Sequence, residues 1–157
     1  MNWTQGNYVV SDEKKRLKVS KIAAIMKQGF WCASYTKGKI ARLVQNSFWI
    51  GLYFRGQLVG FTRVITDKET VTTILDFMIH KAHQGQGNGK FLMTCLIEHP
   101  YLKNTSMSLG TQTADHFFEK FGFERNGSMM HRWPVSPSHG LFIVPRVGSP
   151  PKEKRSA

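Results

Sequence analysis

Residues 83–93, HQGQGNGKFLM, place three glycines within five positions and then continue as an apolar pattern with helical spacing. The glycines are Gly85, Gly87 and Gly89. Glycine loses more conformational freedom on folding than any other residue, so this cluster indicates a backbone that something approaches closely. The preceding run of aromatic and branched residues predicts a strand, and residues 88–98 predict a helix that ends before Pro100. A strand, a glycine-rich turn and a helix N-terminus together make a binding site for an anion.

The spacing of the glycines excludes two common phosphate loops. A dinucleotide-binding loop needs GxGxxG and an acidic residue about 20 positions later, but this chain has GxGxG, with Thr105 near that place. A Walker A loop needs GxxxxGK followed by Ser or Thr, whereas Phe91 follows Lys90 here. On spacing alone, a turn whose glycines only allow tight packing remains the alternative to an anion site.

The rest of the chain predicts a layered α/β (α+β) domain with a mixed sheet. Hydrophobic periodicity predicts helices over residues 18–28, 36–46, 88–98 and 113–121. Strand-like runs cover residues 8–11, 48–54, 58–65, 70–79, 106–109 and 128–133, and the three central runs suit an antiparallel meander. We assign residues 1–133 to one domain and residues 134–157 to a proline-rich basic tail. We expect that tail to be poorly ordered apart from a short strand at residues 141–144.

Composition indicates one folded domain and no membrane partner. The 157 residues are 41% hydrophobic, and no apolar stretch approaches the roughly 20 residues that span a bilayer. The first ten residues lack the basic start and apolar run of a secretory signal. Cys32 and Cys95 stand apart without metal-ligand spacing, so we expect reduced thiols, no metal site and a cytoplasmic protein.

The charge predicts an anionic partner. Lys and Arg total 22 against 10 acidic residues, which gives a net charge of +12. A field of this sign favours nucleic acid, an anionic surface or a phosphorylated small molecule. The basic residues form no long stripe interleaved with aromatic residues, so we do not expect nucleic acid as the partner.

Four segments together resemble one enzyme superfamily. Residues 84–89, QGQGNG, fit the Q/R-x-x-G-x-G/A signature of the GCN5-related N-acetyltransferases (GNAT). Residues 111–123 resemble the superfamily's N-x-x-A-x-x-L-Y-x-K-x-G-F segment, and residues 60–64 resemble its G-x-x-R-V strand. With the HPYL segment at residues 99–102, the chain is most similar to small bacterial GNAT proteins. The resemblance implies the GNAT fold, a mixed and mostly antiparallel central sheet flanked by about four helices.

The resemblance also implies an activity. GNAT enzymes are acetyl-CoA-dependent N-acetyltransferases, in which a primary amine of a small molecule or peptide attacks the thioester directly. Since many members dimerise, it implies a homodimer as well. Phe118 stands where many members carry the tyrosine that protonates the leaving thiolate, and phenylalanine cannot donate a proton. An acyl-CoA-binding sensor or scaffold with little turnover is therefore the alternative.

By resemblance, two segments bind the cofactor. The backbone of Phe77, Met78 and Ile79 pairs with the pantetheine arm, and we assign to Met78 the backbone contact that polarises the thioester carbonyl. Thr111 replaces the asparagine that commonly contacts pantetheine, and Phe118 lies nearby. The pyrophosphate is held by the loop residues Gln84, Gly85, Gln86, Gly87, Asn88, Gly89 and Lys90.

Asp76 is the candidate general base. A two-residue period places Asp76, Met78 and His80 on one face of their strand. A carboxylate in an apolar strand can have a raised pKa and accept a proton, and the alternative is an ion pair with Arg63.

We assign Phe30, Trp31 and Arg63 to the acceptor pocket. An arginine inside a strand needs an anionic partner or solvent. For the two aromatic residues, ordinary core packing is the alternative.

Overall fold

The computed structural model describes residues 1–125 and 127. The expected strands at residues 128–133 and 141–144, and the domain boundary at residue 133, lie outside the described residues.

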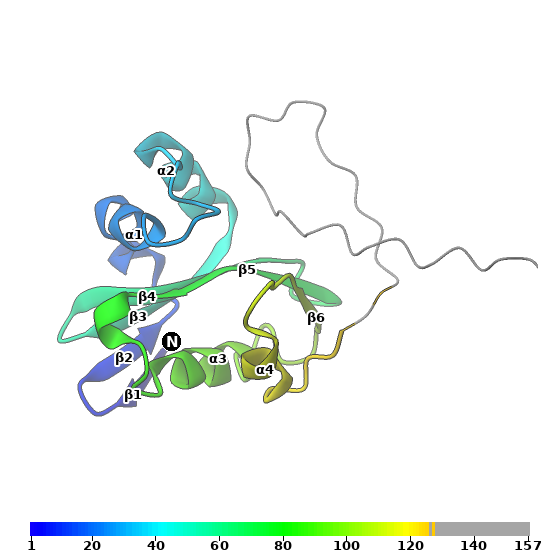
Figure 1. The fold of residues 1–157 in the computed structure, drawn as a ribbon. Coiled ribbons are helices and arrows are strands. Elements are labelled where there is room, and N and C mark those ends of the chain that lie inside the picture. Colours follow the sequence, from blue (N-terminus) through cyan, green and yellow to red (C-terminus); the bar gives the residue numbers. More distant parts are fainter. Residues whose placement is uncertain (126, 128–157) are drawn as a thin grey trace, which may run out of the picture.

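Six strands form one open sheet in which spatial order equals chain order (Figure 1). Strands β1 to β5 pair antiparallel, and β6 joins β5 in parallel. This confirms the mixed, mostly antiparallel sheet that the sequence predicts. The strands are β1 (Asn2–Gln5), β2 (Tyr8–Ser11), β3 (Phe48–Phe54), β4 (Gln57–Thr66), β5 (Val71–Ile79) and β6 (Ser106–Leu109).

Helices cover both faces of the sheet (Figure 1). Helices α1 (Val19–Met26) and α2 (Lys37–Asn46) lie on one face, where α1 packs against β4 and β5. Helix α3 (Asn88–Ile97) packs on the other face against β3 and β5, and the short α4 (Asp115–Glu119) lies beside it. Short 3-10 helices cover Lys14–Arg16 and Lys81–His83.

The two faces of the sheet carry separate hydrophobic cores. Ile50, Leu92 and Leu96 belong to the core under α3 and are fully buried. Ile22 and Phe61 belong to the core under α1 and α2 and are equally buried. Because each fully buried side chain of this kind contributes roughly 1.5–3 kcal/mol, the two cores hold the sheet rigidly between its helices.

Two elements differ from the prediction. The sequence analysis missed β1, because three of its four residues are polar and exposed, and the single apolar residue, Trp3, makes no hydrophobic period. A tight turn at Gly6, with φ of 56°, returns the chain into β2. Helix α4 covers five residues rather than the nine expected, and its start is fixed where Thr111 Oγ1 accepts the backbone N–H of Ala114 at 3.0 Å.

A bulge interrupts β5 beside the point where β6 ends. Arg63 pairs with Leu75 and Phe61 pairs with Met78, so two steps on β4 oppose three steps on β5. The extra residue is accommodated at Asp76, whose φ is +46°. Bulges bend a strand and increase its twist. Pairing of β5 with β6 stops at Ile74 and Leu109, so the rest of β5 has an edge without a strand partner.

Residues 1–125 and 127 contain neither a candidate membrane-spanning helix nor a candidate metal site. None of the helices there combines the length and the apolar character that crossing a bilayer requires. No group of three or more His, Cys, Asp or Glu side chains in that part of the chain could hold a metal ion.

Candidate active site

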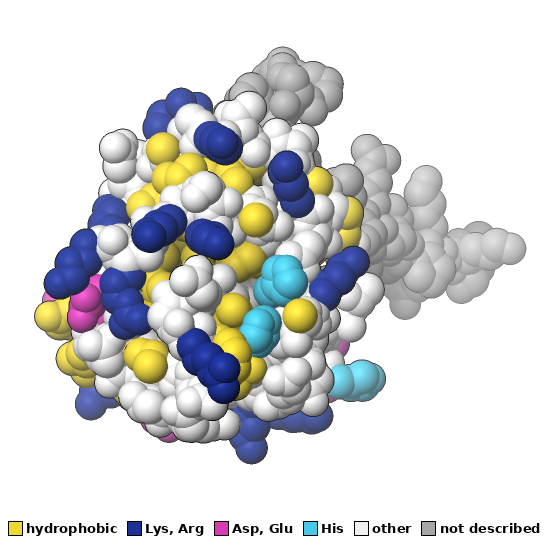
Figure 2. Space-filling model, turned by 90° about the vertical axis from the view of Figure 1, so that its left-hand side faces the viewer, with side chains coloured by type: hydrophobic (Ala, Val, Ile, Leu, Met, Phe, Trp, Pro, Cys, Tyr) yellow, Lys and Arg dark blue, Asp and Glu magenta, His cyan; other side chains and the backbone are white. Residues whose placement is uncertain are grey.

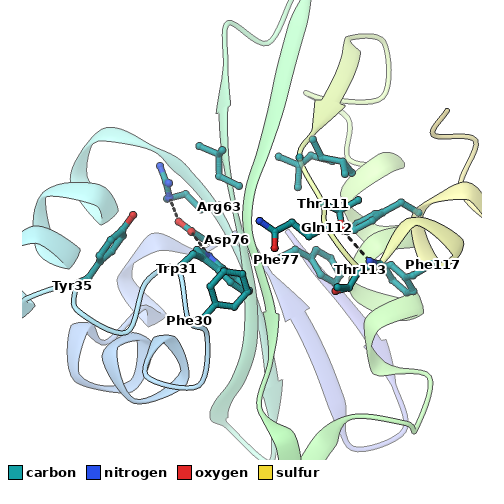
Figure 3. Close-up of a pocket in the computed structure, with 16 residues that line it drawn as sticks. Phe30, Trp31, Tyr35, Arg63, Asp76, Phe77, Thr111, Gln112, Thr113 and Phe117 are labelled. Atoms are coloured by element: carbon teal, nitrogen blue, oxygen red, sulfur yellow. Dashed lines mark hydrogen bonds and ion pairs between the residues drawn. The ribbon is translucent and has the colours of Figure 1, made fainter. Parts of the chain in front are cut away.

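A cavity of about 240 Å³ opens where the pairing of β5 with β6 ends (Figure 3). One wall is the loop after α1, with Phe30, Trp31 and Tyr35. Residues 74–77 of β5 and Arg63 of β4 form the floor. The opposite wall is the segment over residues 109–114, together with Phe117 and Phe118 of α4.

This cavity brings together seven of the predicted site residues. Phe30 and Trp31 are 72% and 38% exposed, so they form the rim of the cavity rather than core. The others are Arg63, Asp76, Phe77, Thr111 and Phe118. Met78, Ile79 and the glycine-rich loop do not line it, because they lie beyond the bulge towards the end of β5.

Asp76 and Arg63 form a buried ion pair. Arg63 Nε donates to Asp76 Oδ2 at 2.5 Å, and the two side chains are 4–6% exposed. Trp31 Nε1 donates to the other carboxylate oxygen at 3.4 Å. Both carboxylate oxygens of Asp76 therefore accept hydrogen bonds. The ion pair with Arg63, which the sequence analysis gave as the alternative to a general base, is present in the structure.

Tyr35 is a site residue that the sequence analysis missed. Its ring lines the cavity, and Lys39 Nζ lies 3.5 Å from the ring centroid. Burial raises the pKa of Tyr35, and the charge of Asp76 adds to that effect. The phenol therefore keeps its proton at neutral pH. Only the aromatic character of residues 30–35 hinted at this wall in the sequence.

Cys32 lies beneath the same wall but is not a nucleophile. Burial, with a further contribution from Asp76, raises the pKa of Cys32 to about 12. Its Sγ donates to the carbonyl of Met26 at 3.2 Å. Burial likewise raises the pKa of Cys95, on α3, to about 12.

We expect both thiols to resist modification in the folded protein. The thiolate is the reactive form, and at pH 8 very little of either cysteine ionises. A chromogenic disulfide reagent should therefore react slowly with the native protein and rapidly with both thiols in denaturant. Fast reaction of either thiol without denaturant would contradict the buried placement.

The open edge of β5 is suited to pair with an extended ligand. The N–H of His80 donates to the carbonyl of Val59 on β4 at 2.8 Å. Because backbone groups alternate sides along a strand, Met78 also faces β4, where it pairs with Phe61. Phe77 and Ile79 then face the open edge, where the carbonyl of Ile79 already accepts from Gln84 Nε2. The backbone of Met78, for which the sequence analysis predicts the polarising contact, faces β4 rather than this edge.

The glycine-rich loop is held by its own side chains. Gln84 Nε2 donates to the carbonyl of Ile79 at 2.7 Å, and Gln86 Nε2 donates to that of Ala82 at 3.2 Å. Asn88 is buried and donates to the carbonyl of His83 at 2.9 Å. Tyr8 Oη donates to Gln86 Oε1 at 3.1 Å. These contacts fix the loop while leaving its main chain exposed.

The main chain of this loop presents a row of free donors. Within the described part of the chain, no acceptor pairs with the backbone N–H groups of residues 85–90. Gly85 and Gly87 have φ of 73° and 79°, and no atom lies within 4 Å of a Cβ built on either. The first turn of α3 adds its positive dipole end. The loop is therefore suited to hold an anion against its main chain. A side chain at position 85 or 87 would fill the space that the anion needs.

Two features at the other end of the site differ from the GNAT pattern. Thr111 Oγ1 already accepts the N–H of Ala114 just before α4, which leaves its hydroxyl proton and one lone pair for a ligand. Phe118 is 8% exposed and packs against Phe77, with ring centroids 5.9 Å apart. Its position is apolar, so any proton that the reaction needs there comes from elsewhere.

Comparison with known proteins agrees with this geometry. The model of the acetyltransferase (GNAT) domain family matches residues 45–125, which is just over half of the chain. A search of curated protein sequences found no match.

Solved structures share the fold. A GNAT-family protein from Xanthomonas campestris is 26% identical with a TM-score of 0.78, and the match covers 88% of this chain and 98% of that one. A GNAT-family acetyltransferase from Streptococcus pneumoniae, 17% identical, has a TM-score of 0.64 over 82% of this chain and 98% of that one. Glucosamine-6-phosphate N-acetyltransferase from Arabidopsis thaliana, 15% identical, has a TM-score of 0.61 over 80% of this chain and 97% of that one.

Proposed function

The chain belongs to the acetyltransferase (GNAT) domain family, and we propose that it transfers the acetyl group of acetyl-CoA to a primary amine of a small molecule or peptide. The observation that carries the proposal is the row of unpaired backbone N–H groups at residues 85–90. A pyrophosphate offers the negative oxygens that such donors at a helix N-terminus bind.

The residues present fit this donor. The open space above Gly85 and Gly87 leaves room for a phosphate group against the backbone, which any Cβ would occupy. Residues 84–90 would hold the pyrophosphate, and Phe77 and Ile79 would pair with the pantetheine arm. When bound, acetyl-CoA supplies an activated acyl thioester.

The acceptor approaches from the wall of Phe30, Trp31 and Tyr35. Tyr35, on the wall opposite Phe118, lines the cavity with a phenol that keeps its proton at neutral pH. Asp76 already accepts from Arg63 and Trp31, so it orients these two side chains and receives an amine proton only through water. Catalysis then depends mainly on placing amine and thioester together, an effect worth up to several kcal/mol.

Charge on the surface supports a small anionic ligand over nucleic acid. Figure 2 shows Lys and Arg side chains spread singly over the face of α1, α2 and the loop after β5, with hydrophobic side chains between them. A nucleic-acid surface would gather them in a stripe.

Calorimetric titration with acetyl-CoA tests the proposal. We expect saturable binding at micromolar to millimolar concentrations, and release of CoA thiol when amines are added. Absence of binding at millimolar acetyl-CoA would refute it.

A CoA-binding sensor with little turnover is the second candidate. The buried phenyl ring of Phe118 favours it, since no donor stands at that position. Tight binding of acetyl-CoA without thiol release across a broad amine panel would select the sensor.

A further inference from the structure

The acceptor side of the cavity contains an arginine that is only partly paired. Arg63 is 6% exposed, lines the cavity, and uses Nε for Asp76. Its Nη1 donates weakly to Ser47 Oγ at 3.4 Å. Among residues 1–125 and 127, Nη2 has no hydrogen-bond partner, yet it is not one of the fully enclosed unpaired atoms there. Nη2 therefore keeps some exposure to solvent, and it belongs to a side chain that lines the cavity.

The balance of charge around this arginine is positive. Asp76 and Arg63 are the charged residues among those described that line the cavity, and they neutralise each other. Lys39 adds a positive charge over the ring of Tyr35, and Arg42 lies within electrostatic range of Lys39. Partial burial lowers the pKa of Lys39, with Arg63 and Arg42 acting in the same direction and Asp76 opposing them. The positive charge of Lys39 beside the neutralised Arg63–Asp76 pair favours a ligand that brings a negative charge.

The size of the cavity limits the acceptor. The cavity of about 240 Å³ would have to hold both the acetyl-thioester end of acetyl-CoA and the acceptor. Ligand sites commonly measure about 300–1,000 Å³, so the acceptor share is that of a small molecule.

We propose that the acceptor is a small amine carrying a carboxylate or phosphate group, which is bound by the guanidinium of Arg63 and attracted by the charge of Lys39 over the neighbouring Tyr35 ring. The proposal rests on the transferase function and narrows its acceptor. Arginine suits the role because its planar fork donates two parallel hydrogen bonds to such anions. The positive surroundings also favour the neutral amine, the form that attacks the thioester.

Matched amine pairs test the proposal. The full chain is assayed for CoA release with phenylalanine against phenethylamine, and with glucosamine 6-phosphate against glucosamine. Each pair differs chiefly in the anionic group. We expect kcat/KM to be higher for the anionic member of at least one pair by roughly tenfold or more. Which pair shows the preference tells whether the site binds a carboxylate or a phosphate. Equal values in both pairs, or preference for the neutral members, would overturn the proposal.

Two variants assign the preference to the site. Lys39→Gln should reduce the anionic preference several-fold, through a higher KM for the anionic member of the pair. Lys21→Gln removes the same charge from an exposed position of α1 away from the cavity and should leave the preference intact. An unchanged preference in Lys39→Gln would also overturn the proposal.

A binding arm separates this inference from the proposed function. The same four amines are titrated into protein saturated with CoA. If no amine is acetylated, tighter binding of an anionic member still supports the inference, and equal or absent binding refutes it. Failure of the transferase function itself appears as missing acetyl-CoA binding in the earlier titration.

Discussion

Replacing Gly87 with valine should lower the affinity for acetyl-CoA by at least about 100-fold. Gly87 has φ of 79°, a conformation that costs an ordinary L-residue about 1–2 kcal/mol and a β-branched residue more. The valine side chain would also fill the space above the free N–H donors. Loss of two charge-assisted hydrogen bonds, each worth about 1.5–3 kcal/mol, is enough for the predicted factor. Calorimetric titration measures it.

Gly56→Val is the matched control. Gly56 also has φ of 79° with no atom within 4 Å of a built Cβ, but it lies in the turn between β3 and β4. Its substitution should reduce stability similarly and leave acetyl-CoA affinity unchanged. Wild-type affinity in Gly87→Val, or equal losses in both variants, would show that the loop is not the pyrophosphate site.

Arg63→Met should destabilise the fold by about 3–5 kcal/mol at neutral pH. The substitution leaves the carboxylate of Asp76 buried with only the 3.4 Å contact from Trp31, and an unpaired buried charge is costly. Urea unfolding at neutral pH measures the loss.

Arg125→Met provides the comparison. Arg125 pairs with Asp115, but these side chains are 70% and 28% exposed, so breaking the pair should cost about 0–1 kcal/mol. If Arg63→Met were no more destabilising than Arg125→Met, the pair at the bulge would not support the fold as described.

The sequence predicted the elements whose patterns are strong. The runs at β3, β4 and β5 alternate or are continuously apolar, and the glycine loop marks the start of α3, so these boundaries agree within a few residues. Strand β1 escaped prediction because pairing with β2, rather than hydrophobic burial, makes it a strand.

The site could be predicted only in part. The segment LDFMI reads as a regular strand, and nothing in it reveals the extra residue at Asp76. The bulge depends on pairing with β4, which is not encoded locally. Pairing with β4 also decides which edge of β5 the backbone of Met78 faces. The position of Tyr35 in the cavity wall depends on tertiary contacts as well.

The parallel pairing of β6 also has a consequence for the order of assembly. Strands β3, β4 and β5 pair through short turns, whereas β6 reaches β5 only after the crossover through α3. Contacts between distant parts of a chain form more slowly than local ones. During synthesis from the N-terminus, the Arg63–Asp76 floor can therefore be complete before the gap between β5 and β6 exists. The floor on the proposed acceptor side is therefore built first, and the cavity between the two strands forms only once β6 has joined the sheet.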